Sequence, residues 1–226
     1  MSRILSFNQY LFESSSDDVV NSFYSAIKST QPEESPRGSN KGPEIEPLQK
    51  GVGAGPGDPW CAGFVYNVLG KTGFSNLIKK QIPDDAAVRY HWAKSKGKKM
   101  KYKTDMDINS ILPGMVFFYL SKDKKTGGYP GNGHTGIILS VNKINKTWTA
   151  VEGNANPLDG SREGYGTFIV TRKLSDPSIS KDPKDHPAKL LGFIDYFFQK
   201  CFKIKSILSP SFLARAMKNI DKQVKR

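Results

Sequence analysis

Apolar residues in the first part of the chain recur every three or four positions, the spacing of an amphipathic helix. Segments with this spacing begin near residues 17, 43, 58 and 84, each after residues that favour a helix start or a turn. After residue 103 the pattern changes to short β-branched or aromatic runs, which predict strands. These runs cover residues 115–120, 136–141, 148–151, 167–172 and 190–197. Helices followed by strands indicate an α+β fold in which N-terminal helices pack on an antiparallel sheet.

The chain is expected to form one main domain with an extension at each end. Residues 1–41 are predicted to be an N-terminal extension with one helix, and residues 42–198 the domain that holds the sheet. Residues 199–226 are predicted to form a basic amphipathic C-terminal helix. Three arrangements of this helix stay open: packing on the domain, lying on an anionic membrane, or docking to a larger assembly.

The charge of the chain is strongly unbalanced. Lys and Arg number 34 against 21 Asp and Glu, so the net charge is +13 at pH 7. Such a field favours anionic partners, and charge alone does not choose among nucleic acids, membranes and acidic wall polymers. The lysine-rich stretch 94–103 is expected to be either a solvated loop or an attraction site for an anionic polymer.

The cysteine content narrows the class of protein. Cys61 and Cys201 are too few for a disulfide framework, and no Cys-x-x-Cys pair indicates a thiolate zinc site. The glycine-rich stretch 51–57 is followed by no Gly-Lys-Ser or Gly-Lys-Thr, which argues against a phosphate-binding loop. We find no signal-peptide pattern and no apolar run of membrane-spanning length, so synthesis in a cytoplasm without a signal peptide is expected.

Cys61 is the first candidate for chemistry, because the start of a helix stabilises a reactive thiolate. Asp58 suits the N-cap of the predicted helix and Pro59 its first position, which places Cys61 in the first turn. His134 precedes the apolar strand 137–141, from where its ring can reach a neighbouring helix end and act as the base. Taken singly, each has an ordinary alternative: an inert buried cysteine or an exposed loop histidine.

Glu152 and Asn154 follow at the end of the next predicted strand. A catalytic imidazole works best when its second nitrogen donates to a carboxylate or amide oxygen. Residues two apart on a strand face the same side, so one is expected to orient His134 and the other to assist it or polarise the substrate. Taken alone, Glu-Gly-Asn is an ordinary hairpin turn. His91, in a predicted helix, and His186, in an irregular loop, are poorer candidates for the base.

These residues resemble the CHAP family, the cysteine- and histidine-dependent amidohydrolases and peptidases. Residues 58–65, Asp-Pro-Trp-Cys-Ala-Gly-Phe-Val, are similar to the nucleophile segment of that family. Residues 133–138, Gly-His-Thr-Gly-Ile-Ile, are similar to its histidine strand, and residues 151–154, Val-Glu-Gly-Asn, to its acid and amide segment. The other similar segments are residues 113–118, 160–164 and 191–194. The resemblance covers about residues 42–196.

The resemblance implies a papain-like α+β fold and hydrolysis of an amide or peptide bond of bacterial peptidoglycan, by an N-acetylmuramoyl-L-alanine amidase or an endopeptidase. By the matching positions, Cys61 is the nucleophile, His134 the base, and Glu152 with Asn154 the orienting pair. Some such domains carry calcium in an acidic loop before the cysteine. Residues 51–57 contain no acid, so we expect no metal and no cofactor.

Two alternatives to a wall hydrolase stay open. One is a catalytically inactive structural or virion protein that keeps a CHAP-like fold, and the other is a papain-like hydrolase or secreted effector that acts on a non-wall substrate. Residues 3–14 resemble the start of many tailed-phage proteins, which favours a phage lysin released at lysis or carried in a virion. The expected partners are peptidoglycan, anionic wall polymers or membrane surfaces, and virion proteins. No specific nucleic acid is expected.

Overall fold

The computed structural model describes residues 25–72, 80–103, 105–123, 125–156, 164–174 and 189–196. Residues 25–28 are helical, and Ala26 and Ile27 are buried there, as the predicted first helix requires. The rest of that helix and the predicted C-terminal helix over residues 199–226 lie outside the described residues. No helix in the described ranges is long and apolar enough to cross a membrane.

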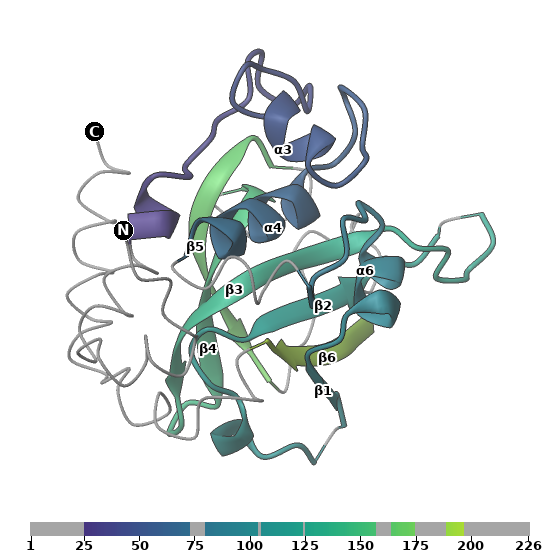
Figure 1. Ribbon diagram of the computed structural model, residues 1–226. Helices are drawn as coiled ribbons and strands as arrows, with labels where there is room; N and C mark the ends of the chain where they lie inside the picture. The colour runs from purple at the N-terminus through teal and green to yellow at the C-terminus, as the bar shows by residue number, and fades with distance from the viewer. Residues whose placement is uncertain are drawn as a thin grey trace.

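A six-stranded sheet forms the centre of the described structure (Figure 1). Its strands are β1 (Lys98–Lys101), β2 (Val116–Leu120), β3 (Gly133–Asn142), β4 (Thr147–Ala155), β5 (Gly166–Lys173) and β6 (Lys189–Asp195). The order across the sheet is β1-β6-β2-β3-β4-β5, and all neighbouring strands are antiparallel. The predicted antiparallel sheet is confirmed. Strands β3 and β4 are longer than predicted, so that His134 and Glu152 lie within them.

Strand β1 was not predicted from the sequence. The stretch 94–103 was expected to be a solvated loop or a polymer-binding segment, but residues 98–101 pair with β6 at the edge of the sheet. Edge strands often carry lysines, because charged side chains discourage pairing with a further strand. The lysines that suggested a loop are therefore compatible with the outermost strand.

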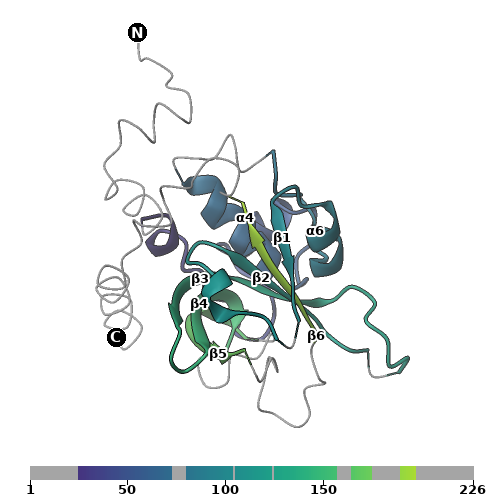
Figure 2. The same cartoon turned by 90° about the horizontal axis from the view of Figure 1, so that it is seen from below.

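Three helices accompany the sheet: α3 (Glu46–Lys50), α4 (Cys61–Lys71) and α6 (Val88–Lys94), and a 3-10 turn, η1, spans Ile108–Ser110. Helix α4 packs on β3 and β4, α3 packs on α4, and α6 packs on β2 and β3. Figures 1 and 2 show α4 and α6 on the same side of the strands. Helix α6 begins at Val88, later than the predicted start near residue 84, and Tyr90 on this helix is 55% exposed.

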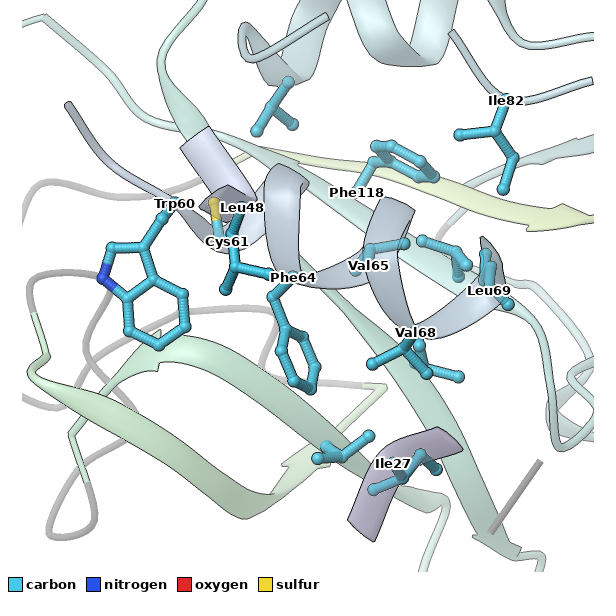
Figure 3. Packing of buried hydrophobic residues seen from close by; sticks show 14 of the residues in the cluster. Ile27, Leu48, Trp60, Cys61, Phe64, Val65, Val68, Leu69, Ile82 and Phe118 are labelled. Atoms are coloured by element: carbon cyan, nitrogen blue, oxygen red, sulfur yellow. The ribbon is translucent and has the colours of Figure 1, made fainter. Parts of the chain in front are cut away.

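The sheet has an apolar cluster on each face. Alternate residues of β2 divide between them: Val116 and Phe118 join the cluster beneath α4, while Phe117 and Tyr119 join the opposite one. Figure 3 shows the first cluster, in which Trp60, Cys61, Phe64, Val65, Val68 and Leu69 come from the start and buried face of α4. Burial of this face fixes the start of α4 against the strands that carry the other candidate residues.

The predicted cap of α4 is wrong. Its N-cap is Trp60, and the Asp58 carboxylate instead accepts a hydrogen bond from the backbone N–H of Gly55 at 2.8 Å. The Trp60 indole donates to the buried Glu34 carboxylate at 2.9 Å, and the Gln49 amide donates to the Asp58 carbonyl at 2.6 Å. These tertiary hydrogen bonds hold residues 58–60 outside the helix, whereas a local capping pattern considers only sequence neighbours.

Candidate active site

Cys61 is the first residue of α4, so it lies in the first helical turn as predicted. Backbone N–H groups in this turn lack intrahelical acceptors and form the positive end of the helix dipole. Figure 3 shows the sulfur at the start of the helix. Cys61 is 3% exposed, and its thiol donates a weak hydrogen bond to the Gly133 carbonyl, with 3.9 Å between sulfur and oxygen. The nucleophile candidate is thereby held beside the start of β3.

His134 is the second residue of β3 and is fully buried. Its Nε2 lies 2.8 Å from Oε2 of Glu152, which is on the neighbouring strand β4. Because a carboxylate only accepts hydrogen bonds, Nε2 carries a proton and Glu152 orients the ring. Nδ1 has no fixed hydrogen-bond partner among the described residues. The Cys61 side chain is close enough to the ring to raise the pKa of His134. Nδ1 is therefore the nitrogen available to take a proton from the thiol.

The protonation of His134 is set by opposing effects. Burial acts to lower the pKa of His134, but hydrogen bonding and charge interactions with Cys61 and Glu152 outweigh it and raise the pKa from 6.5 to about 9. The ring is consequently held as imidazolium near neutral pH. An imidazolium beside a sulfur favours the thiolate, which is the nucleophilic form of cysteine.

Arg172 was missed by the sequence analysis. It lies on β5, is 5% exposed, and donates two hydrogen bonds to Glu152, from Nε to Oε1 at 2.8 Å and from Nη2 to Oε2 at 2.6 Å. Burial acts to raise the pKa of Glu152, but the charge of Arg172, followed by the contacts with His134, lowers it. The local sequence offered one sign of this role, which is that a charged residue follows the apolar residues 168–170 in the same predicted strand.

Asn154 is not joined to this group by a hydrogen bond. The β4–β5 register shifts between Glu152 and Ala155, and Asn154 has a φ of 56°, so the two-residue alternation behind the prediction does not hold. Asn154 is 1% exposed, and neither atom of its amide has a hydrogen-bond partner among the described residues. The structure thus brings together Cys61, His134 and Glu152. Asn154 is buried two residues after Glu152 and makes no hydrogen bond to this group.

His91 is a second buried histidine and belongs to a different environment. It lies on α6 against the Phe118 ring, with 5.4 Å between ring centroids, and neither ring nitrogen has a hydrogen-bond partner within the described ranges. Burial lowers the pKa of His91 from 6.5 to about 4 and outweighs the opposing influence of Asp85. His91 is therefore neutral near pH 7, unlike His134.

The described residues contain no cluster of three His, Cys, Asp or Glu side chains that could hold a metal ion. Comparison with protein families gives one match: residues 53–154 fit the model of the CHAP domain. This segment of the chain is therefore similar to the CHAP domain. The matched range includes Cys61, His134, Glu152 and Asn154, whereas Arg172 lies beyond its end. Neither the curated proteins nor the solved structures gave a match.

A CHAP domain indicates a hydrolase that acts on peptidoglycan and has an α+β, papain-like fold. The described structure agrees with that class, since an antiparallel sheet carries the histidine and acid, and a helix start carries the cysteine. Two distant parts of the CHAP segment, around Cys61 and His134, meet where α4 packs on β3.

Proposed function

We propose that this chain hydrolyses an amide or peptide bond of bacterial peptidoglycan, with Cys61 as nucleophile and His134 as general base and acid. The observation that carries the proposal is the arrangement of three groups inside the CHAP segment. The Cys61 sulfur lies at a helix start, the His134 ring is next to it, and the Glu152 carboxylate holds Nε2 at 2.8 Å. This order of nucleophile, base and orienting acid is what acyl transfer by a thiol requires.

The reaction proceeds through a thioester. The Cys61 thiolate attacks the scissile carbonyl carbon, and backbone N–H groups of the first turn of α4, including that of Cys61, donate to the oxyanion. His134 gives its Nδ1 proton to the departing amine nitrogen as the carbon–nitrogen bond breaks. A water molecule then gives a proton to His134 and attacks the thioester carbon. Collapse of this second intermediate expels the sulfur and leaves a carboxylic acid.

Glu152 supports both steps by keeping the ring in one orientation. Its hydrogen bond to Nε2 leaves Nδ1 directed to the proton transfers at the sulfur and at the substrate nitrogen. The negative charge also stabilises the imidazolium that persists until the amine departs. We assign Asn154 to the same site on the basis of its CHAP position, as an amide that completes the site when substrate is bound.

The test is digestion of purified peptidoglycan, followed by turbidity and by mass spectrometry of the released fragments. The native chain is expected to clear the suspension, and Cys61→Ala and His134→Ala to fail while keeping their circular dichroism spectra. Cys201→Ser, which removes the other thiol, is the matched control and should retain activity. Clearing by the Cys61→Ala protein would show that the nucleophile is assigned wrongly.

The fragments also separate an amidase from an endopeptidase. Amidase action frees the amino group of L-alanine next to muramic acid, whereas endopeptidase action frees an amino group within the stem or cross-bridge. A folded native chain that leaves peptidoglycan intact would favour the inactive virion protein or the hydrolase of a non-wall substrate. We propose that the active enzyme is a phage lysin or a virion-carried lysin, in line with the resemblance of residues 3–14 to tailed-phage proteins.

A further inference from the structure

Glu152, the acid of the proposed site, is bound by the buried guanidinium of Arg172. Arg172 reaches Glu152 from β5, and its two hydrogen bonds engage both carboxylate oxygens, at 2.8 and 2.6 Å. One of these oxygens, Oε2, also accepts a hydrogen bond from Nε2 of His134. The guanidinium lies over the rings of Phe117 and Tyr119, at 5.6 and 5.7 Å from their centroids. The arginine is thus fixed in place by aromatic packing as well as by its ion pair.

The charges of this buried group balance in both protonation states. Among the described residues, the charged or titratable groups that act on His134 and Glu152 are Cys61 from α4 and Arg172 from β5, and Tyr119 of β2 lies opposite His134 across the sheet. With thiol and neutral imidazole, Glu152 and Arg172 cancel. After the thiol proton moves to His134, the new pair of charges also cancels. Removing Arg172 would leave one uncompensated negative charge among buried side chains, which is strongly unfavourable.

We propose that Arg172 is a positioning residue of this hydrolase, which keeps Glu152 ionised and fixed in orientation so that Glu152 can hold the His134 ring toward Cys61. The inference rests on the proposed function, because it assigns a role relative to His134 and Cys61. It goes beyond the CHAP match, which ends at residue 154. The planar fork of arginine matters as well as its charge, since it binds both carboxylate oxygens at once.

The experiment compares Arg172→Met and Arg172→Lys with the native chain. The control is Lys173→Met, which removes a positive charge from the adjacent, exposed position of β5. Two readouts are taken between pH 4 and 9: peptidoglycan hydrolysis, and alkylation of Cys61 by iodoacetamide in a Cys201→Ser background. Alkylation needs no wall substrate, so the role of Arg172 can be judged even if peptidoglycan proves to be the wrong substrate.

For Arg172→Met we expect both rates at pH 7 to fall on the order of tenfold to a hundredfold, by analogy with the loss of residues that orient metal ligands. The acid limb of both profiles should move up by about one pH unit or more, because Glu152 takes up a proton more readily without the cation. In Arg172→Lys the acid limb should lie between those of Arg172→Met and the native chain, since lysine restores the positive charge but not the two parallel hydrogen bonds of the guanidinium. Lys173→Met should match the native profiles.

A double-mutant cycle separates this role from a structural one. In a Glu152→Gln background there is no carboxyl group to titrate, so adding Arg172→Met should not move the acid limb further. The Glu152→Gln/Arg172→Met protein also removes both buried charges together, which gives a testable variant if Arg172→Met alone does not fold. An acid limb that stays in place in Arg172→Met, or moves equally in both backgrounds, would overturn the proposal.

Discussion

Replacement of Glu152 by Gln tests how the buried acid sets the protonation of His134. The substitution keeps a carbonyl oxygen as an acceptor for Nε2 but removes the negative charge. In the native chain the pKa of His134 rises from 6.5 to about 9. At 1.36 kcal/mol for each pKa unit, this favours the imidazolium by about 3 kcal/mol. Burial opposes that preference, and the contacts with Cys61 and Glu152 supply it, so loss of the carboxylate should lower the pKa of His134.

The same substitution has a consequence for stability. A pKa raised on folding adds stability that is complete below the unfolded pKa of 6.5 and is lost as the pH rises through about 9. The native free energy of unfolding should therefore decline over this interval by about 3 kcal/mol from His134. In Glu152→Gln the decline should be smaller, because one of the two groups that raise the pKa of His134 is neutralised. The free energy of unfolding should also start from a lower value, because Arg172 loses the carboxylate that it binds.

Two measurements check these values. Imidazole signals in nuclear magnetic resonance titrations report each histidine, and the chain contains 3 histidines, so His134 is identified by comparison with His134→Ala. Urea unfolding between pH 6 and 9.5 gives the stability. Glu33→Gln is the matched control, since Glu33 is a half-exposed acid paired with Arg37. A pKa of His134 that is the same in Glu152→Gln and in the native chain would refute the reasoning.

Two further substitutions test the packing around the site. Burial lowers the pKa of His91 to about 4, so its contribution to stability is complete above the unfolded value of 6.5 and is lost as the pH falls toward 4. His91→Phe should abolish an acid destabilisation of about 3 kcal/mol in urea unfolding, and an unchanged pH slope would contradict this. A Cβ on Gly153 would lie 2.6 Å from Phe64 and 2.7 Å from Trp60, so Gly153→Ala should cost about 1–3 kcal/mol and slow Cys61 alkylation. Gly55→Ala, where the nearest atom is 3.6 Å away, is its control, and equal melting temperatures for the two variants would count against this packing.

Local sequence patterns were enough to predict strands β2 to β6 and the placement of Cys61. Strands β2 and β6 consist largely of apolar residues buried on both faces, and the buried face of α4 shows plain helical spacing. Such patterns depend on neighbours in the sequence. The predicted pairing of Cys61 with His134 relied on the CHAP resemblance, because these residues are brought together only where α4 packs on β3.

The features that the sequence patterns did not predict depend on contacts between distant segments. Arg172 finds its acid 20 residues away on the neighbouring strand, and no local pattern marks that pair. The Asp58 cap is displaced because the Trp60 indole binds Glu34, 26 residues earlier in the chain. Asn154 departs from strand alternation because of a register shift against β5 that the sequence does not reveal. Each is a tertiary effect that overrides a local preference.

The most direct measurement of the central claim is the rate of Cys61 alkylation by iodoacetamide at pH 7. It should be made on folded Cys201→Ser protein, with and without His134→Ala. An ionised sulfur paired with the His134 imidazolium predicts labelling well above that of the same chain unfolded in urea, and a clear loss of that excess in His134→Ala. Labelling of the folded chain that is no faster than that of the unfolded one, or that is indifferent to His134→Ala, would contradict the account.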